Sequence, residues 1–296
     1  MLTGLSSPAH NSQAILAPIM YRNRVPLPKA WAILGAHLLV LICCLSPLYA
    51  DTGEVTLRVP AFEDGRHHYF HDLLRQSLAA LGHELHIDPV WELPQTRREA
   101  DLAEGVWADV DWYVRTDERD SLFRHTELAL TDGLIGHRVF LIRPEDAELY
   151  AEIATIEDLA DTGLVAGMGQ GWYDYQVWTS NGLPVTQTAH PGNLYQMVAL
   201  GDRGVDYFPR GIAETVIEAP SHPYLGVEPR LMLIYDRSFR FYFSDAVSDA
   251  TVSLIDDALQ RAAASGLRRE LLREYFGGVY DELGFDTRHR IYLQTP

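Results

Sequence analysis

A glycine-rich turn at residues 167–171 most constrains how this chain can fold. An apolar run at 164–166 precedes it, and a helix-like run at 173–181 follows it. A strand, a glycine turn and a helix start, in that order, leave backbone N–H groups pointing outward, where the helix dipole favours an anion or a polar group. The spacing differs from a dinucleotide-binding fingerprint. The turn therefore predicts either a ligand-binding loop or an ordinary strand-to-helix connection.

Strand-like and helical patterns alternate along the rest of the chain. The predicted strands are residues 55–59, 83–90, 110–114, 136–142, 164–166 and 205–208, and the predicted helices are 69–81, 94–104, 156–160, 173–181, 191–200, 251–264 and 267–276. This alternation predicts an α/β fold with mixed, mostly parallel sheets. We divide the chain into a leader (1–50), the first part of lobe 1 (51–142), lobe 2 (143–237) and a return to lobe 1 with C-terminal helices (238–296).

The leader has the pattern of a secretory signal peptide. Three basic residues precede a stretch at 30–45 that is apolar apart from His37, and a small-residue exit ends at Ala50. This order predicts export to the periplasm with cleavage near Ala50. An uncleaved anchor is the competing interpretation, and Met20 is a more plausible start of the signal than Met1.

Composition excludes several classes of function. The formal net charge of −17 argues against nucleic acid or an anionic membrane as partner. Both cysteines, Cys43 and Cys44, lie in the leader, so the chain after Ala50 has no disulfide and no thiolate metal site.

The order of four features resembles the type II periplasmic solute-binding proteins of the amino-acid-receptor kind (extracellular solute-binding protein family 3). The secretory leader is the first, and Thr116-Asp117-Glu118-Arg119, similar to the T-x-x-R of that family, is the second. The third runs from residues 156–159 through the glycine turn, and the fourth from residues 197–200 to Val205-Asp206. The resemblance spans about residues 55–276 and implies two lobes with a ligand cleft between them.

The resemblance implies a set of ligand-binding residues. Arg119 corresponds to the arginine that holds the ligand carboxylate, a role that suits its planar, two-pronged guanidinium. Gly169, Gly171 and Trp172 correspond to the turn that supplies N–H groups, although Trp172 replaces the hydroxyl residue of the family. Arg210 stands where the family places an acid for the ligand amino group. A basic residue there would repel an ammonium, which favours a ligand with a second anionic or polar group.

Aromatic residues complete the candidate set. Phe62 follows the first strand, and Trp112 and Tyr113 alternate on the third, so one of these two is expected to face the core and the other a sheet edge or the cleft. Arg119 could instead be a surface residue, and Trp172 a plug of the core.

His67 and His71 are four residues apart, a spacing that suits two metal ligands on one helix face. A solvated helix start or a cleft-lining role is the preferred interpretation, and we predict neither a metal nor a cofactor.

These observations predict a monomeric binding protein, not an enzyme, that captures an amino-acid-like solute or an organic acid for transport or sensing. Its partner would be an ABC permease or a sensor membrane protein. The alternatives are a dehydratase-like periplasmic enzyme on the same scaffold, with Asp174, Glu214 and His190 as candidate acids and bases, and an interaction module without a transport role.

Overall fold

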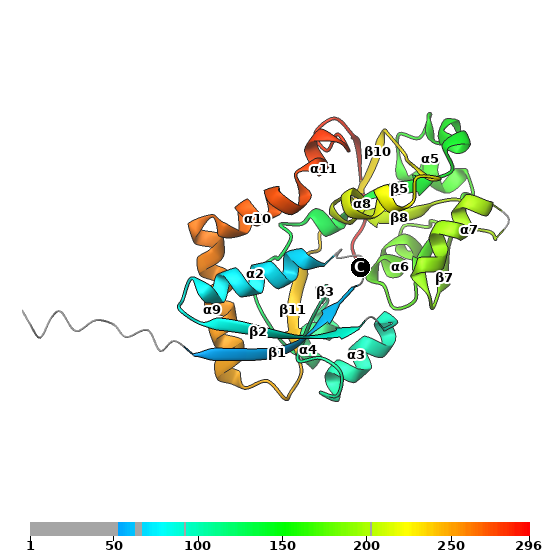
Figure 1. Ribbon diagram of the computed structural model, residues 1–296. Helices are drawn as coiled ribbons and strands as arrows, with labels where there is room; N and C mark the ends of the chain where they lie inside the picture. Colours follow the sequence, from blue (N-terminus) through cyan, green and yellow to red (C-terminus); the bar gives the residue numbers. More distant parts are fainter. Residues whose placement is uncertain (1–52, 63–66, 92, 202) are drawn as a thin grey trace, which may run out of the picture. The chain divides into compact units, whose positions relative to one another are not determined.

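The computed structural model describes residues 53–62, 67–91, 93–201 and 203–296 (Figure 1). The predicted signal peptide and both cysteines lie outside these residues. Across the described ranges, no helix combines the length and the apolar character that crossing a bilayer would require.

The first part of the chain builds a parallel strand pair, an antiparallel three-stranded sheet and the helices that cover them. Its elements are β1 (Glu54–Ala61), α2 (His68–Ala79), β2 (Glu84–Trp91), α3 (Gln95–Ala103), β3 (Val110–Val114), α4 (Asp117–Leu122) and β4 (Arg124–His125). β1 runs parallel to β2, and α2 buries a stripe that includes Leu73, Leu74 and Leu78. This helical spacing explains why α2 forms here and which face it turns inward.

The middle of the chain builds a second set of sheets. Its elements are β5 (His137–Ile142), α5 (Ile156–Asp161), β6 (Ala166–Gly169), α6 (Tyr173–Ser180), β7 (Val185–Thr188), α7 (Leu194–Leu200), β8 (Phe208–Gly211), α8 (Ile212–Glu218), β9 (Gly226–Val227) and β10 (Leu231–Ile234). β6 and β7 pair in parallel, whereas β5 is antiparallel to β8, β9 and β10.

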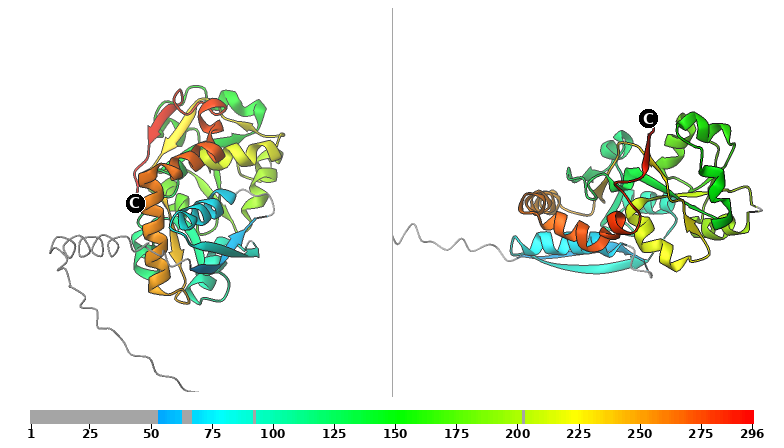
Figure 2. Two further views of the ribbon diagram at one scale, coloured as in Figure 1. Left: turned by 60° about the vertical axis from the view of Figure 1, so that its left-hand side comes forward. Right: turned by 90° about the horizontal axis from the view of Figure 1, so that it is seen from above.

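The last part of the chain adds one strand to the sheets of the first part and one strand to the sheets of the middle part. β11 (Phe239–Phe243) lies between β3 and β4, and β12 (His289–Tyr292) pairs in parallel with β10. Three helices lie between these two strands along the sequence: α9 (Asp249–Ser265), α10 (Leu267–Phe276) and α11 (Gly278–Asp281). α9 and α10 pack against α2, as Figures 1 and 2 show from different sides.

Two large apolar cores result. One gathers β1, α2, β11, α9 and α10, and the other gathers β6, α6, β10 and β12. Strands β5 and β10 belong to both, since Val139 and Met232 point into the first core and Phe140 and Leu233 into the second. Two cores joined through shared strands make a two-lobed α/β fold, which confirms the predicted fold class. The residue boundaries of the lobes stay a prediction.

Two details differ from the sequence prediction. Antiparallel pairing is more extensive than predicted, because β5 and β11 lie between antiparallel neighbours. The predicted strand 205–208 is displaced toward the C-terminus, and β8 continues through Pro209 and Arg210. Pro209 is tolerated because β8 stands at the end of its sheet, where a missing N–H removes no ladder bond.

Candidate ligand-binding site

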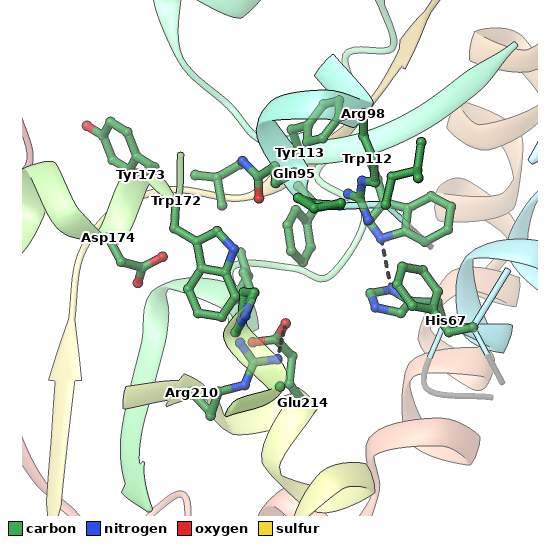
Figure 3. Close-up of a pocket in the computed structure, with 18 of the residues that line it drawn as sticks. His67, Gln95, Arg98, Trp112, Tyr113, Trp172, Tyr173, Asp174, Arg210 and Glu214 are labelled. Atoms are coloured by element: carbon green, nitrogen blue, oxygen red, sulfur yellow. Dashed lines mark hydrogen bonds and ion pairs between the residues drawn. The ribbon is translucent and has the colours of Figure 1, made fainter. Parts of the chain in front are cut away.

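A cavity of about 400 Å³ takes lining residues from both cores. Five of the seven predicted binding residues line it: Phe62, Trp112, Arg119, Trp172 and Arg210. Gly169 and Gly171 do not line the cavity but shape the turn that carries Trp172. Figure 3 shows Trp172 and Arg210 on one side of the cavity, with Trp112 and His67 across from them.

Arg119 is buried and rigidly held. Thr116 caps α4 by accepting a hydrogen bond from the Arg119 backbone N–H at 3.1 Å. The guanidinium donates from Nη1 to the Val114 carbonyl at 2.7 Å and from Nη2 to Glu99 Oε1 at 2.8 Å. It also stacks 5.3 Å from the centre of the Tyr113 ring. Arg119 is therefore not a surface arginine, and Glu99 already supplies a carboxylate to it.

The glycine turn approaches α3 closely. Gly171 has φ +83°, and a Cβ atom there would lie 2.8 Å from Thr96 Cγ2. Its carbonyl accepts a hydrogen bond from Gln95 Nε2 at 3.0 Å and a longer one from Arg119 Nη2 at 3.5 Å. Gly171 thus satisfies two needs at once: a left-handed backbone conformation and room for a neighbouring helix.

Gly169 makes room for Trp172. A Cβ atom at Gly169 would lie 2.4 Å from Trp172 Cε2, so only glycine lets the indole fold back over its own turn. The indole then stacks on Phe208 with ring centres 6.0 Å apart and lies 4.9 Å from the Arg210 guanidinium carbon. Trp172 is therefore both a lining residue and a packed one.

The charge of Arg210 is compensated. Glu218 accepts hydrogen bonds from its Nε at 2.7 Å and its Nη2 at 2.6 Å, and Glu214 lies 3.0 Å from Nη2. Burial alone would lower the pKa of Arg210, but these carboxylates outweigh burial and raise the pKa well above its ordinary value. The expectation that Arg210 would repel an ammonium assumed an uncompensated charge, whereas two carboxylates lie within 3.0 Å of this guanidinium.

Arg138 forms a second buried ion cluster beside the first. It contacts Asp174 through Nε at 2.8 Å and through Nη2 at 2.9 Å, and Tyr235 donates its hydroxyl to Asp174 at 2.9 Å. Glu214 links the two clusters, since it lies 3.2 Å from Arg138 Nη1. The two acids proposed for catalysis, Asp174 and Glu214, are thus both held in ion pairs.

His67 and the aromatic side chains form the opposite wall. Trp112 donates its indole N–H to His67 Nδ1 at 2.9 Å, as Figure 3 shows, and Phe62 lies 4.1 Å from the His67 ring centre. Both Trp112 and Tyr113 are buried, and both line the cavity. We expected one of the two to face the core and the other a sheet edge or the cleft; instead, both belong to buried apolar clusters and both also line the cavity.

His71 is engaged elsewhere, through a 2.7 Å contact between its Nε2 and the Pro60 carbonyl. Burial lowers its pKa below the ordinary value. Considering the placed residues only, no group of three or more histidine, cysteine, aspartate or glutamate side chains forms a metal-binding cluster.

Several lining residues escaped the sequence analysis as binding residues. They are Arg98, Arg138, Tyr195, Phe208 and Phe239. Arg138 lies within the predicted strand 136–142. An arginine among the apolar residues of a strand is the sequence pattern that could have indicated a buried ion pair here.

Replacing Gly171 by alanine is expected to separate the turn from α3. The new methyl group would overlap Thr96, and the positive φ adds backbone strain of about 1–2 kcal/mol. We expect a larger radius of gyration in solution scattering and a loss of solute affinity of about tenfold or more. Gly182→Ala is the matched control, because Gly182 has φ +72° but no atom within 4 Å of the new Cβ. Equal effects of the two substitutions would show that strain alone, and not contact with α3, explains them.

The sequence matches no model of a known protein family. It also matches no curated protein. Solved structures do resemble the fold. An ancestral arginine-binding protein bound to arginine has a TM-score of 0.55 and 16% identity, over 75% of this chain and 98% of that one. An amino acid ABC transporter substrate-binding protein from Streptococcus pneumoniae, bound to L-arginine, has a TM-score of 0.56 and 16% identity, over 76% and 94%.

A third similar structure is an ancestral amino acid-binding protein described as a precursor of cyclohexadienyl dehydratase. Its TM-score is 0.54 and its identity 14%, over 75% of this chain and 95% of that one. At these identities the likeness establishes the fold. The chain has the two-lobed fold of the periplasmic amino-acid-binding proteins, as the resemblance in its sequence predicted.

Proposed function

We propose that this protein is a secreted binding protein that captures a small polar solute between its two lobes, for transport or sensing. The observation that carries the proposal is the cavity of about 400 Å³, whose lining includes Arg119 and Trp112 from one side and Trp172 and Arg210 from the other. Pockets of this size suit small ligands, and closure of two lobes on a ligand is a common binding motion.

The proposed setting follows from the leader. The protein would act in the periplasm after cleavage near Ala50, as a monomer that delivers its solute to an ABC permease or a sensor membrane protein. Phe62, Trp112, Arg119, Trp172 and Arg210 would contact the solute, while Gly169 and Gly171 would shape the turn.

An enzyme on the same scaffold is the second candidate, because one similar structure is described as a precursor of a dehydratase. A general acid or base needs a free group with a suitable pKa. Asp174 and Glu214 are instead bound to arginines at distances of 2.8 to 3.2 Å. These ion pairs weigh against the two acids as catalysts and favour binding, while the third candidate, His190, lines the cavity outside these pairs.

A thermal-shift screen of the purified protein tests the proposal. The panel holds amino acids, organic acids, carboxamides, ring compounds and sugars. A solute at about 100 times its dissociation constant should add about 2.7 kcal/mol and raise the melting temperature by several degrees. Turnover of the bound compound, followed by chromatography, would favour the enzyme. The absence of any shift across the panel would contradict the binding function.

A further inference from the structure

We propose that Glu99 determines specificity by occupying Arg119, so that the cavity selects a planar, uncharged ring compound with a hydrogen-bonding edge and rejects its carboxylate analogue. The inference rests on the proposed function, since it names the class of solute that the same cavity takes.

The first step is the state of Arg119. Nη1 is bonded to Val114, Nη2 to Glu99, and one face of the guanidinium is stacked on Tyr113. The side chain is only 9% exposed. The third guanidinium nitrogen, Nε, has no hydrogen-bond partner but is buried. A solute carboxylate that formed a two-pronged pair through Nη2 would have to displace Glu99.

Glu99 is itself fixed in place. Gln95, one turn earlier on α3, donates from Nε2 to the same Oε1 atom at 2.8 Å, and the same Nε2 also donates to the Gly171 carbonyl at 3.0 Å. The carboxylate is thus part of a chain of contacts from Arg119 through Gln95 to the glycine turn. A solute carboxylate at Arg119 would break that chain and bring a second carboxylate close to Glu99, and two like charges beside one guanidinium are unfavourable.

The other cations of the wall are compensated as well. Arg98 lies 3.1 Å from Asp111, Arg138 is paired with Asp174 and Glu214, and Arg210 is paired with Glu214 and Glu218. With Arg119 and Glu99 included, four arginines face five carboxylates. Of these carboxylates, Asp174 and Glu214 line the cavity, and the other three lie behind its wall. An added anion would therefore meet arginines that are already paired, and burying a charge without a partner of its own is unfavourable.

Aromatic rings provide the remaining surface. Trp112 and Trp172 lie on opposite sides of the cavity (Figure 3). Phe62 packs on His67 beside Trp112, and Phe208 stacks on Trp172. Rings on opposed walls favour a flat partner, because stacked or edge-to-face contacts need planar faces. The polar edge of such a compound would form hydrogen bonds with the Arg119–Glu99 pair through one uncharged donor group and one uncharged acceptor group.

Titration calorimetry with matched pairs tests the proposal. The probes are benzamide with benzoate, nicotinamide with nicotinate and, as the aliphatic pair, glutamine with glutamate. For the wild-type protein we expect a ring carboxamide to bind about tenfold or more tightly than its acid, and more tightly than the aliphatic pair. Glu99→Gln removes the competing charge at nearly constant volume, so the preference for the amide should fall about tenfold.

Two further variants make the result specific. Glu104→Gln changes an exposed acid next to the end of the same helix and should leave the preference unchanged. Glu99→Asp keeps the charge and should keep the preference for the amide. If Glu99→Gln does not fold, this second variant still tests the role of the charge at position 99. A wild-type preference for the acids, tighter binding of the aliphatic pair, or an unchanged preference in Glu99→Gln would overturn the proposal. If none of the probes binds but another solute from the screen does, this inference fails and the binding function stands; if no solute binds at all, both fail.

Discussion

Replacing Arg138 by methionine is expected to lower the free energy of unfolding by about 3–5 kcal/mol. Arg138 is 2% exposed, and it neutralises Asp174, which is 3% exposed, together with part of the charge of Glu214. Methionine fills a similar volume but leaves both carboxylates without this partner. The loss should therefore reflect uncompensated buried charge and not an empty space. Chemical denaturation followed by circular dichroism measures it.

Two comparisons identify the cause. Arg75→Met removes an arginine whose ion pair with Asp72 is well exposed, and it should cost under about 1 kcal/mol. The double substitution of Arg138→Met with Asp174→Asn removes one of the stranded charges and should recover part of the stability. A cost for Arg138→Met as small as that of the Arg75 control would mean that water reaches the cluster and solvates its acids.

Sequence patterns were sufficient to predict those helices and strands whose structure is determined by consecutive residues. The periodicity of α2 and the alternation of β1 are properties of consecutive residues, and the structure contains both elements close to the predicted places. β8 could not be placed in this way. Its pairing with β5 carries the strand through Pro209 and Arg210, and such pairing depends on residues about seventy positions away.

The site was also predicted only in part: residues in recognisable motifs were identified, and their ion pairs were not. Arg119, Trp172 and Arg210 were found because each stands in a recognisable motif. Glu214 was named only as a candidate catalytic acid, and the ion pairs of Arg119 and Arg210 were not predicted, for two reasons. Glu214 and Glu218 follow Arg210 at intervals of four, but that spacing becomes informative only once α8 is known to be helical. Glu99 lies twenty residues before Arg119, and only the fold of the chain brings the two side chains to a 2.8 Å contact.

The missed acids change the chemical meaning of the site. An arginine without its partner suggests an anionic ligand, whereas the same arginine with a buried carboxylate beside it suggests a neutral one. Motifs thus located the cavity wall, but its net charge depended on contacts between distant segments. This is why the class of solute inferred from the structure differs from the class expected from the sequence.

Replacing Gly136 by alanine is expected to destabilise the fold by about 3 kcal/mol. A Cβ atom there would lie 2.2 Å from the backbone carbonyl oxygen of Tyr235 and 3.2 Å from that of Arg237. The obstacle is main chain, which cannot move aside as a side-chain tip can. Gly136 directly precedes β5 and accepts a hydrogen bond from the Tyr235 N–H at 3.1 Å, where β10 has just ended.

The expected damage concerns the region where both cores meet, because β5 and β10 contribute side chains to each of them. Gly192→Ala is the matched control: neither glycine has a positive φ, and no atom lies within 4 Å of the new Cβ at Gly192, so its effect should stay within about 0.5 kcal/mol. The midpoint of urea unfolding for the two variants measures the difference. If Gly136→Ala proves as mild as its control, the two segments can separate without loss, and the close approach of Gly136 to Tyr235 is not needed to hold β5 and β10 together.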